Sequence, residues 1–200
     1  MHSTETKRLI VGISGASGIV YGVRVLQALR ALGIETHLIM TRAAQVTLAH
    51  ETTMKVADVV ALAAFVHRID DIAACISSGS FKTIGMIIAP CSVRCLSELA
   101  AGVTSTLLTR AGDVVLKERR RLVLMVRETP LHLGHLRSMA AVTEMGAIVM
   151  PPMPAFYSWP KTMDDIIDHT VGRALDLFAL DTGITRWEGP RGRDGGGPAL

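Results

Sequence analysis

The chain has 200 residues, a length that suits a single domain. Hydrophobic residues make up 49% of it and aromatic residues only 4%, so its core must consist of aliphatic side chains, alanine and methionine. A net charge of +3, from 21 basic and 18 acidic residues, is too balanced to indicate a nucleic-acid-binding protein. The apolar fraction is high for a small monomer, which allows part of this surface to lie between subunits.

The sequence predicts a cytoplasmic protein that does not enter a membrane. Its N-terminal apolar run is short and breaks into glycines, unlike a secretory signal. The longest apolar stretch, residues 56–66, contains Asp58 and is too short to span a bilayer. The chain contains three cysteines (Cys75, Cys91 and Cys95), an odd number without framework spacing, which fits a reducing compartment.

Short apolar strands alternate with amphipathic helices along the chain. Strands are predicted at residues 8–13, 35–40, 84–89, 122–126 and 147–150, and helices at residues 19–32, 42–50, 56–65, 92–101, 105–118, 131–145 and 162–180. Thr41 is expected to cap the second helix, Pro90 to end the third strand, and Thr162 with Asp165 to form a capping box. Nearly continuous apolar strands that are each followed by a helix indicate a parallel sheet covered on both faces.

The predicted fold class is therefore α/β, a three-layer sandwich of the flavodoxin-like or Rossmann-like type. Residues 1–187 are expected to form one domain, and residues 188–200, rich in Gly, Pro and Arg, a flexible tail. In such folds, ligands bind at the carboxyl ends of the strands.

The first strand leads into a turn of small residues at 12–18, and a helix follows at once. Such a turn exposes backbone N–H groups and the positive end of the helix dipole, which favours a bound phosphate. It lacks the Gly-Lys-Ser/Thr ending of a Walker loop, and its glycine spacing differs from the dinucleotide fingerprint. A strand-to-helix turn that needs glycine only for its geometry is the alternative interpretation.

A second group of polar residues follows later strands. Ser92 begins a predicted helix, either as a simple N-cap or as part of a second ligand contact. Five further side chains suit an anionic ligand, although the basic ones also fit an ordinary charged surface: Arg110, Lys117, Arg127, Tyr157 and Arg173. Two pairs of residues could each supply half of the ligands of a metal site: His132 with His135, and Cys91 with Cys95. Neither has a matching second pair, so packing histidines and buried thiols are the favoured interpretation.

Together these motifs resemble the UbiX/Pad-type flavin prenyltransferase family over nearly the whole chain. The motifs are GISGASG at 12–18, SSGSF at 77–81, PCS at 90–92, LTRA at 108–111, DVVLKER at 113–119, VRETPLHLGHL at 126–136 and PPMPAFY at 151–157. The resemblance implies metal-independent transfer of a dimethylallyl group from dimethylallyl phosphate to N5 and C6 of reduced FMN. It also implies a homododecamer, and prenylated FMN as a product for a UbiD-type decarboxylase of ubiquinone synthesis or aromatic-acid degradation.

The resemblance assigns roles residue by residue. The implied FMN contacts are Gly15, Ala16, Ser17, Thr41, Ser92, Val93, Arg94, Cys95 and Arg127. The implied contacts of the prenyl phosphate are Tyr157 and Arg173, with Arg110 and Lys117 nearby, Lys117 often from a neighbouring subunit, and Ser17 at the leaving phosphate. Glu51 and Glu128 match residues that handle protons, and either Ile72 or Phe81 stands where relatives shield the allyl cation.

Two other functions remain open from the sequence. A flavin-dependent cysteine-type decarboxylase shares the fold, but it needs a catalytic histidine after the early strands and an Asn-rich motif, neither of which is recognisable here. An FMN-binding carrier or regulatory subunit of an aromatic-acid decarboxylase is the non-enzymatic alternative. The basic residues and Tyr157 favour the transferase, because a flavin carrier has no use for a second phosphate site.

Overall fold

The computed structural model describes residues 6–187 and 189, and shows a six-stranded sheet in which every pairing is parallel. The remainder of the predicted tail at 188–200 lies outside the described residues. The strands are β1 (Arg8–Ile13), β2 (Glu35–Met40), β3 (Phe65–His67), β4 (Gly85–Cys91), β5 (Arg121–Val126) and β6 (Ile148–Val149). Their order is β3-β2-β1-β4-β5-β6, which is the Rossmann order.

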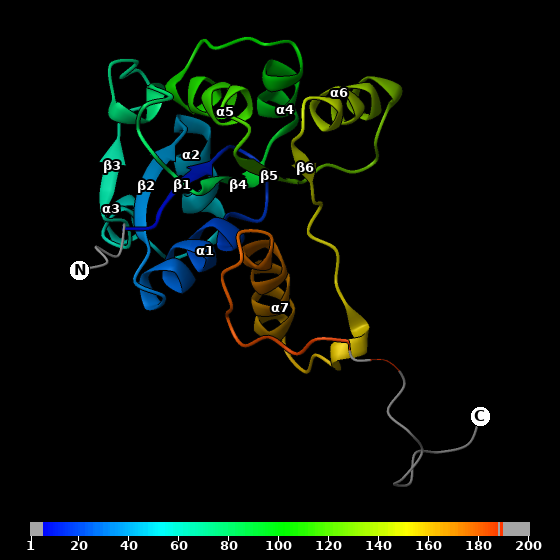
Figure 1. The fold of residues 1–200 in the computed structure, drawn as a ribbon. Helices are drawn as coiled ribbons and strands as arrows, with labels where there is room; N and C mark the ends of the chain where they lie inside the picture. The colour runs from blue at the N-terminus through cyan, green and yellow to red at the C-terminus, as the bar shows by residue number, and fades with distance from the viewer. Residues whose placement is uncertain (1–5, 188, 190–200) are drawn as a thin grey trace, which may run out of the picture.

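Helices cover both faces of this sheet, as the sequence predicts (Figure 1). The helices are α1 (Ile19–Ala31), α2 (Arg42–Glu51), α3 (Val56–Val60), α4 (Val93–Ala100), α5 (Leu107–Lys117), α6 (Leu133–Glu144) and α7 (Met163–Asp176). Alternate residues of β1 enter two separate cores, because successive side chains of a strand point to opposite faces. Leu9 packs in the core that contains residues of α1 and α7, and Ile10 packs in the core of α4 and α5.

The prediction of a helix at residues 56–65 is wrong for the second half of that range. Helix α3 ends at Val60, and Phe65–His67 forms β3 beside β2. Periodicity does not distinguish a short buried helix from a short strand, and here the β-branched and aromatic residues pair with the sheet edge.

Strand β4 does not end at Pro90, as the sequence predicts, but continues to Cys91. Proline cannot donate a hydrogen bond to the ladder, and the register with β5 shifts between Ile88 and Cys91. The carbonyl of Pro90 accepts hydrogen bonds from the backbone N–H and the hydroxyl of Ser14 instead. The last helix also differs, since α7 ends at Asp176 rather than near residue 180.

The strand order reverses between β1 and β4. The chain proceeds from β1 outward through β2 to β3, and then crosses back to β4 on the other side of β1. In open parallel sheets a crevice for ligands forms outside the carboxyl ends of the strands at this switch point. Within the described residues, no helix is long and apolar enough to cross a membrane.

Close packing of α1 on the sheet generates the first testable prediction. A Cβ at Gly22 would lie 2.3 Å from the backbone oxygen of Ala89, which cannot move without disturbing β4. We expect Gly22→Ala to destabilise the fold by about 1–3 kcal/mol through this overpacking. The free energy of unfolding from urea denaturation measures the effect.

Gly112→Ala in α5 is the matched control. A Cβ there would approach only the end of the Leu99 side chain, at 2.8 Å, and that side chain can rotate. The gain in helix propensity, about 0.5–1 kcal/mol, offsets this contact. Equal losses of stability in both variants would show that the close approach of α1 to β4 does not constrain position 22.

Candidate active site

Ser14 joins the two turns at the switch point. Its hydroxyl donates to the carbonyl oxygen of Pro90 at 2.9 Å and accepts from the backbone N–H of Ser92 at 2.8 Å. The residue is only 1% exposed, so these bonds are shielded from water. The turn after β1 and the turn after β4 are thereby held side by side.

Three helices begin at neighbouring strand ends around these turns. Thr41 caps α2 by accepting from the N–H of Ala44 at 3.0 Å, and Ser92 caps α4 by accepting from the N–H of Cys95 at 3.3 Å. Helix α1 begins after Gly18. Each helix N-terminus carries a partial positive charge, so the three together form an edge that favours an anion. The N-cap interpretation of Ser92 is confirmed, and its hydroxyl hydrogen is still available to a ligand.

The N-terminus of α1 is already occupied by a side chain of the protein itself. Gly18 has φ of 93°, which favours glycine, and a glycine N-cap has no side chain to accept the free N–H groups. The carboxylate of Glu51, the last residue of α2, accepts from the N–H of Gly18 at 2.9 Å and from that of Ile19 at 3.0 Å. A carboxylate therefore sits where the sequence predicts a phosphate, and a bound phosphate must use neighbouring donors.

Glu51 is held in its ionised form. Burial alone would raise its pKa, but hydrogen bonds from the Ser17 hydroxyl and from the backbone of Ile19 and Gly18 outweigh this effect. The positive charge of Arg127 acts in the same direction, so the pKa of Glu51 lies below its ordinary value of 4.5. The structure thus brings together three residues that were singled out from the sequence: Glu51 accepts a hydrogen bond from Ser17 and is stabilised by the charge of Arg127.

The remaining residues expected at the flavin site lie along the same edge. Gly15 is tightly packed, because a Cβ there would lie 2.3 Å from that of Ala43. The backbone N–H of Arg127 donates to the carbonyl of Cys91 at 3.1 Å, and the half-buried Glu128 accepts from the N–H of Thr129. Arg94 is exposed and paired with Glu98. We find the predicted FMN contacts gathered at the carboxyl ends of β1, β2, β4 and β5.

Cys91 at this edge is not suited to act as a nucleophile. Cys91 is fully buried, and the neighbouring thiol of Cys95, together with burial, raises the pKa of Cys91 well above its ordinary range. The thiolate form that reacts is therefore strongly disfavoured. His132 is exposed rather than packed in the core; it caps α6 and stacks on the partly buried His135 with ring centroids 3.6 Å apart.

Tyr157 and Arg173 lie away from this edge within one chain. The Tyr157 hydroxyl is 3.2 Å from Nε2 of His169 in α7, on a segment that extends beyond the sheet after β6 (Figure 1). Arg173 lies in the C-terminal half of α7, and Phe178 beyond it packs against Gly85, the first residue of β4. The Arg173 side chain is 47% exposed and pairs with Asp176 at 2.7 Å.

The two basic residues of α5 lie at different ends of that helix. Arg110 is in the first turn and pairs with Asp113 at 2.9 Å. Lys117 is the last residue of the helix, pairs with Glu118, and lies close to Gly79. Since β5 begins just afterwards at Arg121, Lys117 is at the amino edge of the sheet, opposite the turns. One chain therefore does not bring all the expected phosphate contacts together.

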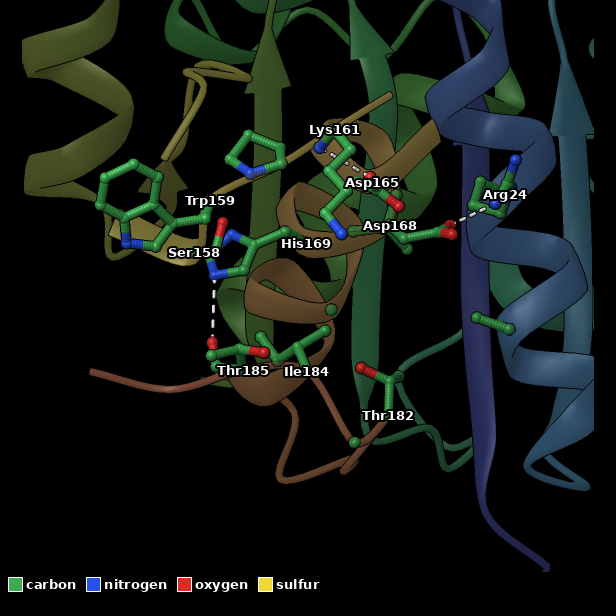
Figure 2. A pocket seen from close by; sticks show the side chains of 15 residues that line it. Arg24, Ser158, Trp159, Lys161, Asp165, Asp168, His169, Thr182, Ile184 and Thr185 are labelled. Carbon is green, nitrogen blue, oxygen red and sulfur yellow. Dashed lines mark hydrogen bonds and ion pairs between the residues drawn. The ribbon is translucent and has the colours of Figure 1, made fainter. Parts of the chain in front are cut away.

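A separate cavity of about 570 Å³ lies between α7, α1 and residues 182–185 (Figure 2). Its lining includes Trp159, Lys161 and His169, but none of the residues expected to contact FMN or the prenyl phosphate. Figure 2 shows His169 directed toward the backbone oxygen of Thr185, at 3.2 Å. We assign the chemistry to the switch-point edge, because the three helix N-termini and Glu51 are there.

Known proteins match this chain over nearly its full length. The Flavoprotein family profile matches residues 1–175. The flavin prenyltransferase UbiX of Escherichia coli K12 is 59% identical over 187 residues, which cover 92% of this chain and 99% of that protein. The flavin prenyltransferase UbiX of Neisseria meningitidis is 58% identical over 184 residues, which cover 92% and 97%.

The chain belongs to the UbiX flavin prenyltransferase family.

Solved structures of the UbiX family agree with this assignment. The crystal structure of AnUbiX (PadA1) in complex with FMN and dimethylallyl pyrophosphate has a TM-score of 0.92 and 49% identity, covering 94% of this chain and 100% of that one. A dodecameric FMN-dependent UbiX-like decarboxylase from Escherichia coli O157:H7 has a TM-score of 0.88 and 51% identity, covering 91% and 100%. The α/β fold predicted from the sequence is thus that of the UbiX family.

Sequence reasoning missed two features of this UbiX-type site. Ser14, within the turn of small residues at 12–18, links two turns through its hydroxyl, and nothing in the local sequence indicates this role. Glu51 was assigned to proton handling, yet it also caps α1. A glycine at the N-cap position was a signal that some other residue must accept the free N–H groups, but the sequence did not identify which one.

The ionised Glu51 generates a pH-dependent prediction. Its pKa is lowered in the folded state, so its contribution to stability is present above pH 4.5 and is lost as the pH falls through the folded value. We expect Glu51→Gln to lower the free energy of unfolding at neutral pH by about 0.5–1 kcal/mol, the usual size of a charge effect at a helix N-terminus. The gap to the wild type should shrink below pH 4.5.

Urea denaturation at neutral pH and at several values below pH 4.5 measures this gap. Glu144→Gln on the exposed end of α6 is the control, and should leave the free energy of unfolding nearly unchanged at every pH. A loss for Glu51→Gln that stays constant with pH would mean that ionisation of Glu51 does not stabilise α1.

Proposed function

We propose that the chain transfers a dimethylallyl group from dimethylallyl phosphate to reduced FMN, at the edge formed by the carboxyl ends of β1, β2, β4 and β5. The observation that carries this proposal is the convergence of three helix N-termini on Ser17, Glu51 and Arg127. It occurs in a chain that is 59% identical to a flavin prenyltransferase.

The residues at this edge fit FMN. Thr41 and Ser92 accept from their helices and retain hydroxyl hydrogens for the ligand, and the N-termini of α2 and α4 direct partial positive charge at this edge. We assign FMN binding to Gly15, Ala16, Ser17, Thr41, Ser92, Val93, Arg94, Cys95 and Arg127. When bound, reduced FMN supplies N5 and C6, the two atoms to which the dimethylallyl group is joined.

The leaving phosphate needs positive charge. A phosphate group carries between one and two negative charges at neutral pH, so preorganised cations and hydroxyls stabilise the transition state in which its bond to carbon breaks. We assign this role to Tyr157, Arg173, Lys117 and Arg110, with the Ser17 hydroxyl close to the departing oxygen. Charge neutralisation by these side chains accounts for transfer without a metal ion.

A proton must leave C6 when the second bond forms. Glu51 and Glu128 are the two carboxylates at the switch-point edge, and Glu51 is held ionised there. Ionised carboxylates accept protons, as does the released phosphate. We assign proton transfer to this group of three acceptors.

The site is completed between copies of the chain. Within one chain Tyr157 bonds to His169, Arg173 pairs with Asp176 and Lys117 pairs with Glu118, and none of these partners belongs to the turns. The segment that bears Tyr157 exposes large apolar side chains. These exposed side chains are Met153, Phe156, Trp159 and Met163. Surface of this kind is typical of subunit contacts, and a UbiX-like neighbour is dodecameric. We assign the same type of assembly to this chain, with a UbiD-type decarboxylase as recipient of the prenylated FMN.

The first experiment is an anaerobic incubation of the purified chain with reduced FMN and dimethylallyl monophosphate. We expect mass analysis of the extracted flavin to show a gain of one C5H8 unit. Arg173→Ala should lower the rate of transfer by about 100-fold or more, because a charge that stabilises the leaving phosphate is lost. FMN should remain bound to this variant.

Arg30→Ala is the control, since Arg30 is exposed at the end of α1 and bonds only to the carbonyl of Ala61. Its rate should equal that of the wild type. Unchanged FMN with both dimethylallyl monophosphate and diphosphate would overturn the transferase proposal in favour of a flavin carrier. Loss of FMN binding in Arg173→Ala would instead overturn the role given to Arg173.

A mixed assembly tests the sharing of the site. Arg127→Ala removes a proposed FMN contact and Arg173→Ala a proposed phosphate contact, so each variant alone should be inactive. If the two residues of one site come from different chains, co-assembly of equal amounts should restore about a quarter of the wild-type activity by random pairing. No recovery in assemblies that contain both variants would show that each chain supplies its own complete site.

A further inference from the structure

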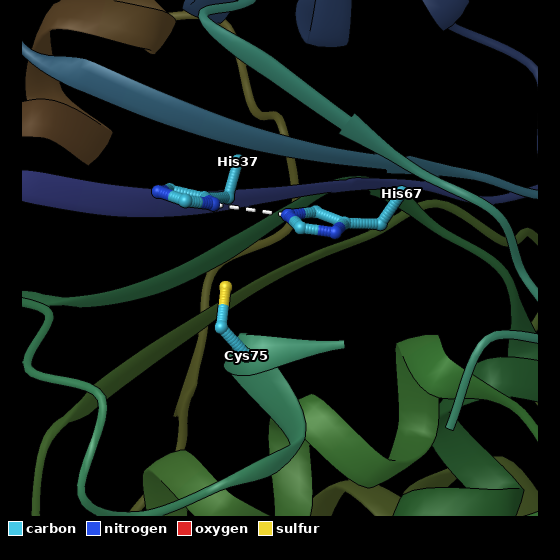
Figure 3. A group of neighbouring side chains, drawn as sticks. All are labelled: His37, His67 and Cys75. Atoms are coloured by element: carbon cyan, nitrogen blue, oxygen red, sulfur yellow. Dashed lines mark hydrogen bonds between the residues drawn. The ribbon is translucent and has the colours of Figure 1, made fainter. Parts of the chain in front are cut away.

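Two histidines and a cysteine meet at the edge of the sheet, away from the switch-point turns. His37 lies in β2, His67 ends β3, and Cys75 begins the short 3-10 helix η1 (Cys75–Ser77). Figure 3 shows the thiol of Cys75 pointing toward the two imidazole rings. His37 Nδ1 is 2.9 Å from His67 Nε2, and all three potential ligand atoms lie within 4.8 Å of one another.

A carboxylate orients the buried member of this cluster. His37 is 3% exposed, and its Nε2 is 3.1 Å from Glu35 Oε1. Arg8 donates to the same oxygen at 2.7 Å, which keeps Glu35 ionised as an acceptor. Nε2 of His37 therefore carries the proton, and its Nδ1 presents a lone pair to the cluster. A carboxylate that holds a histidine in this way is the usual partner of a metal-bound imidazole.

We propose that His37 Nδ1, His67 Nε2 and Cys75 Sγ form a binding site for a divalent transition-metal ion of the zinc type, with Glu35 as the residue that orients His37. Imidazole and thiolate are the ligands that zinc prefers. Zinc bonds of about 2.0 Å to nitrogen and about 2.3 Å to sulfur place the ligand atoms roughly 3.3–3.6 Å apart in a tetrahedron. The observed spacing needs only small movements, and Cys75 is exposed and able to make them.

The aromatic side chains around the cluster hold the imidazole of His37 in one orientation. Phe65 stacks on His37 with ring centroids 5.0 Å apart, and Phe81 packs edge-on at 5.0 Å, which restricts the ring. Coordination releases the thiol proton of Cys75 to solvent or buffer, and the Nε2 proton of His67 is replaced by one on its Nδ1, so the imidazole stays neutral. The exposed side of Cys75 leaves the fourth position to water.

The bound ion would stabilise the edge of the sheet formed by β3, which has few hydrogen bonds to the rest of the fold. Strand β3 has three residues and pairs only with β2, and η1 is a single turn. A metal joins both to the interior strand β2. The segment after η1 is tied to α5 and β5 through Arg120, which donates to the carbonyls of Gly79 and Phe81. The ion would thus stabilise this edge of the fold, away from the turns at the switch point.

Cobalt(II) and zinc(II) are the probes for this site. We expect the full-length chain to bind one Co²⁺ per chain and to show a thiolate-to-cobalt charge-transfer band in a difference spectrum against the metal-free protein. Cys75→Ser should abolish the band, and Zn²⁺ should displace the cobalt. Competition with a chromogenic chelator should show that Glu35→Gln weakens zinc binding by about 10- to 100-fold, the usual effect of removing the residue that orients a ligand.

His50→Gln on α2 is the control for the loss of an exposed histidine, and should leave the band and the zinc affinity unchanged. Zinc should also raise the melting temperature of the wild type, but not that of Cys75→Ser, which changes an exposed side chain and leaves the fold intact. Cobalt binding without the band, or with a band that persists in Cys75→Ser, would overturn the proposal. So would the absence of stoichiometric binding by the wild type.

Discussion

The hydrogen bonds of Ser14 are the constraint on which the rest of the active edge depends. A buried hydroxyl that both donates and accepts fixes the turn after β1 against the turn after β4, where the strand order reverses. The directions of α1 and α4 follow from those turns, and with them the place where their dipoles add. Losing the hydroxyl would leave the backbone N–H of Ser92 without its acceptor, whereas the carbonyl of Pro90 would keep the hydrogen bond from the backbone N–H of Ser14. Leaving a partly buried N–H group unpaired costs more than the bond itself contributes.

At the N-terminus of α1, a carboxylate of the protein itself occupies the place where a ligand anion would bind. Glu51 neutralises two backbone N–H groups that would otherwise remain free, and it also faces the positive charge of Arg127. The edge is therefore less positive near Gly18 than three helix N-termini suggest. The helix N-termini that remain open to an anion at this edge are those of α2 and α4.

Local patterns predicted most of the fold because each strand carries its own signal. The strands at residues 8–13 and 35–40 were predicted with their observed bounds, as were the caps Thr41 and Thr162. Strand β3 was missed because three residues carry no periodicity, and its identity depends on pairing with β2. The flavin contacts were predicted through resemblance, whereas the cluster of His37, His67 and Cys75 arises only when the register of β2 and β3 brings distant residues together.

If, as proposed, Tyr157 on the segment beyond the sheet serves the site of another copy, the activity depends on the concentration of the chain. When the catalytic groups of one site lie on separate copies, an isolated copy of the chain is inactive. Its activity per molecule becomes a function of its own concentration, falling when dilution drives the assembly apart. When few chains are made, the total activity would then fall by a larger factor than the number of chains does.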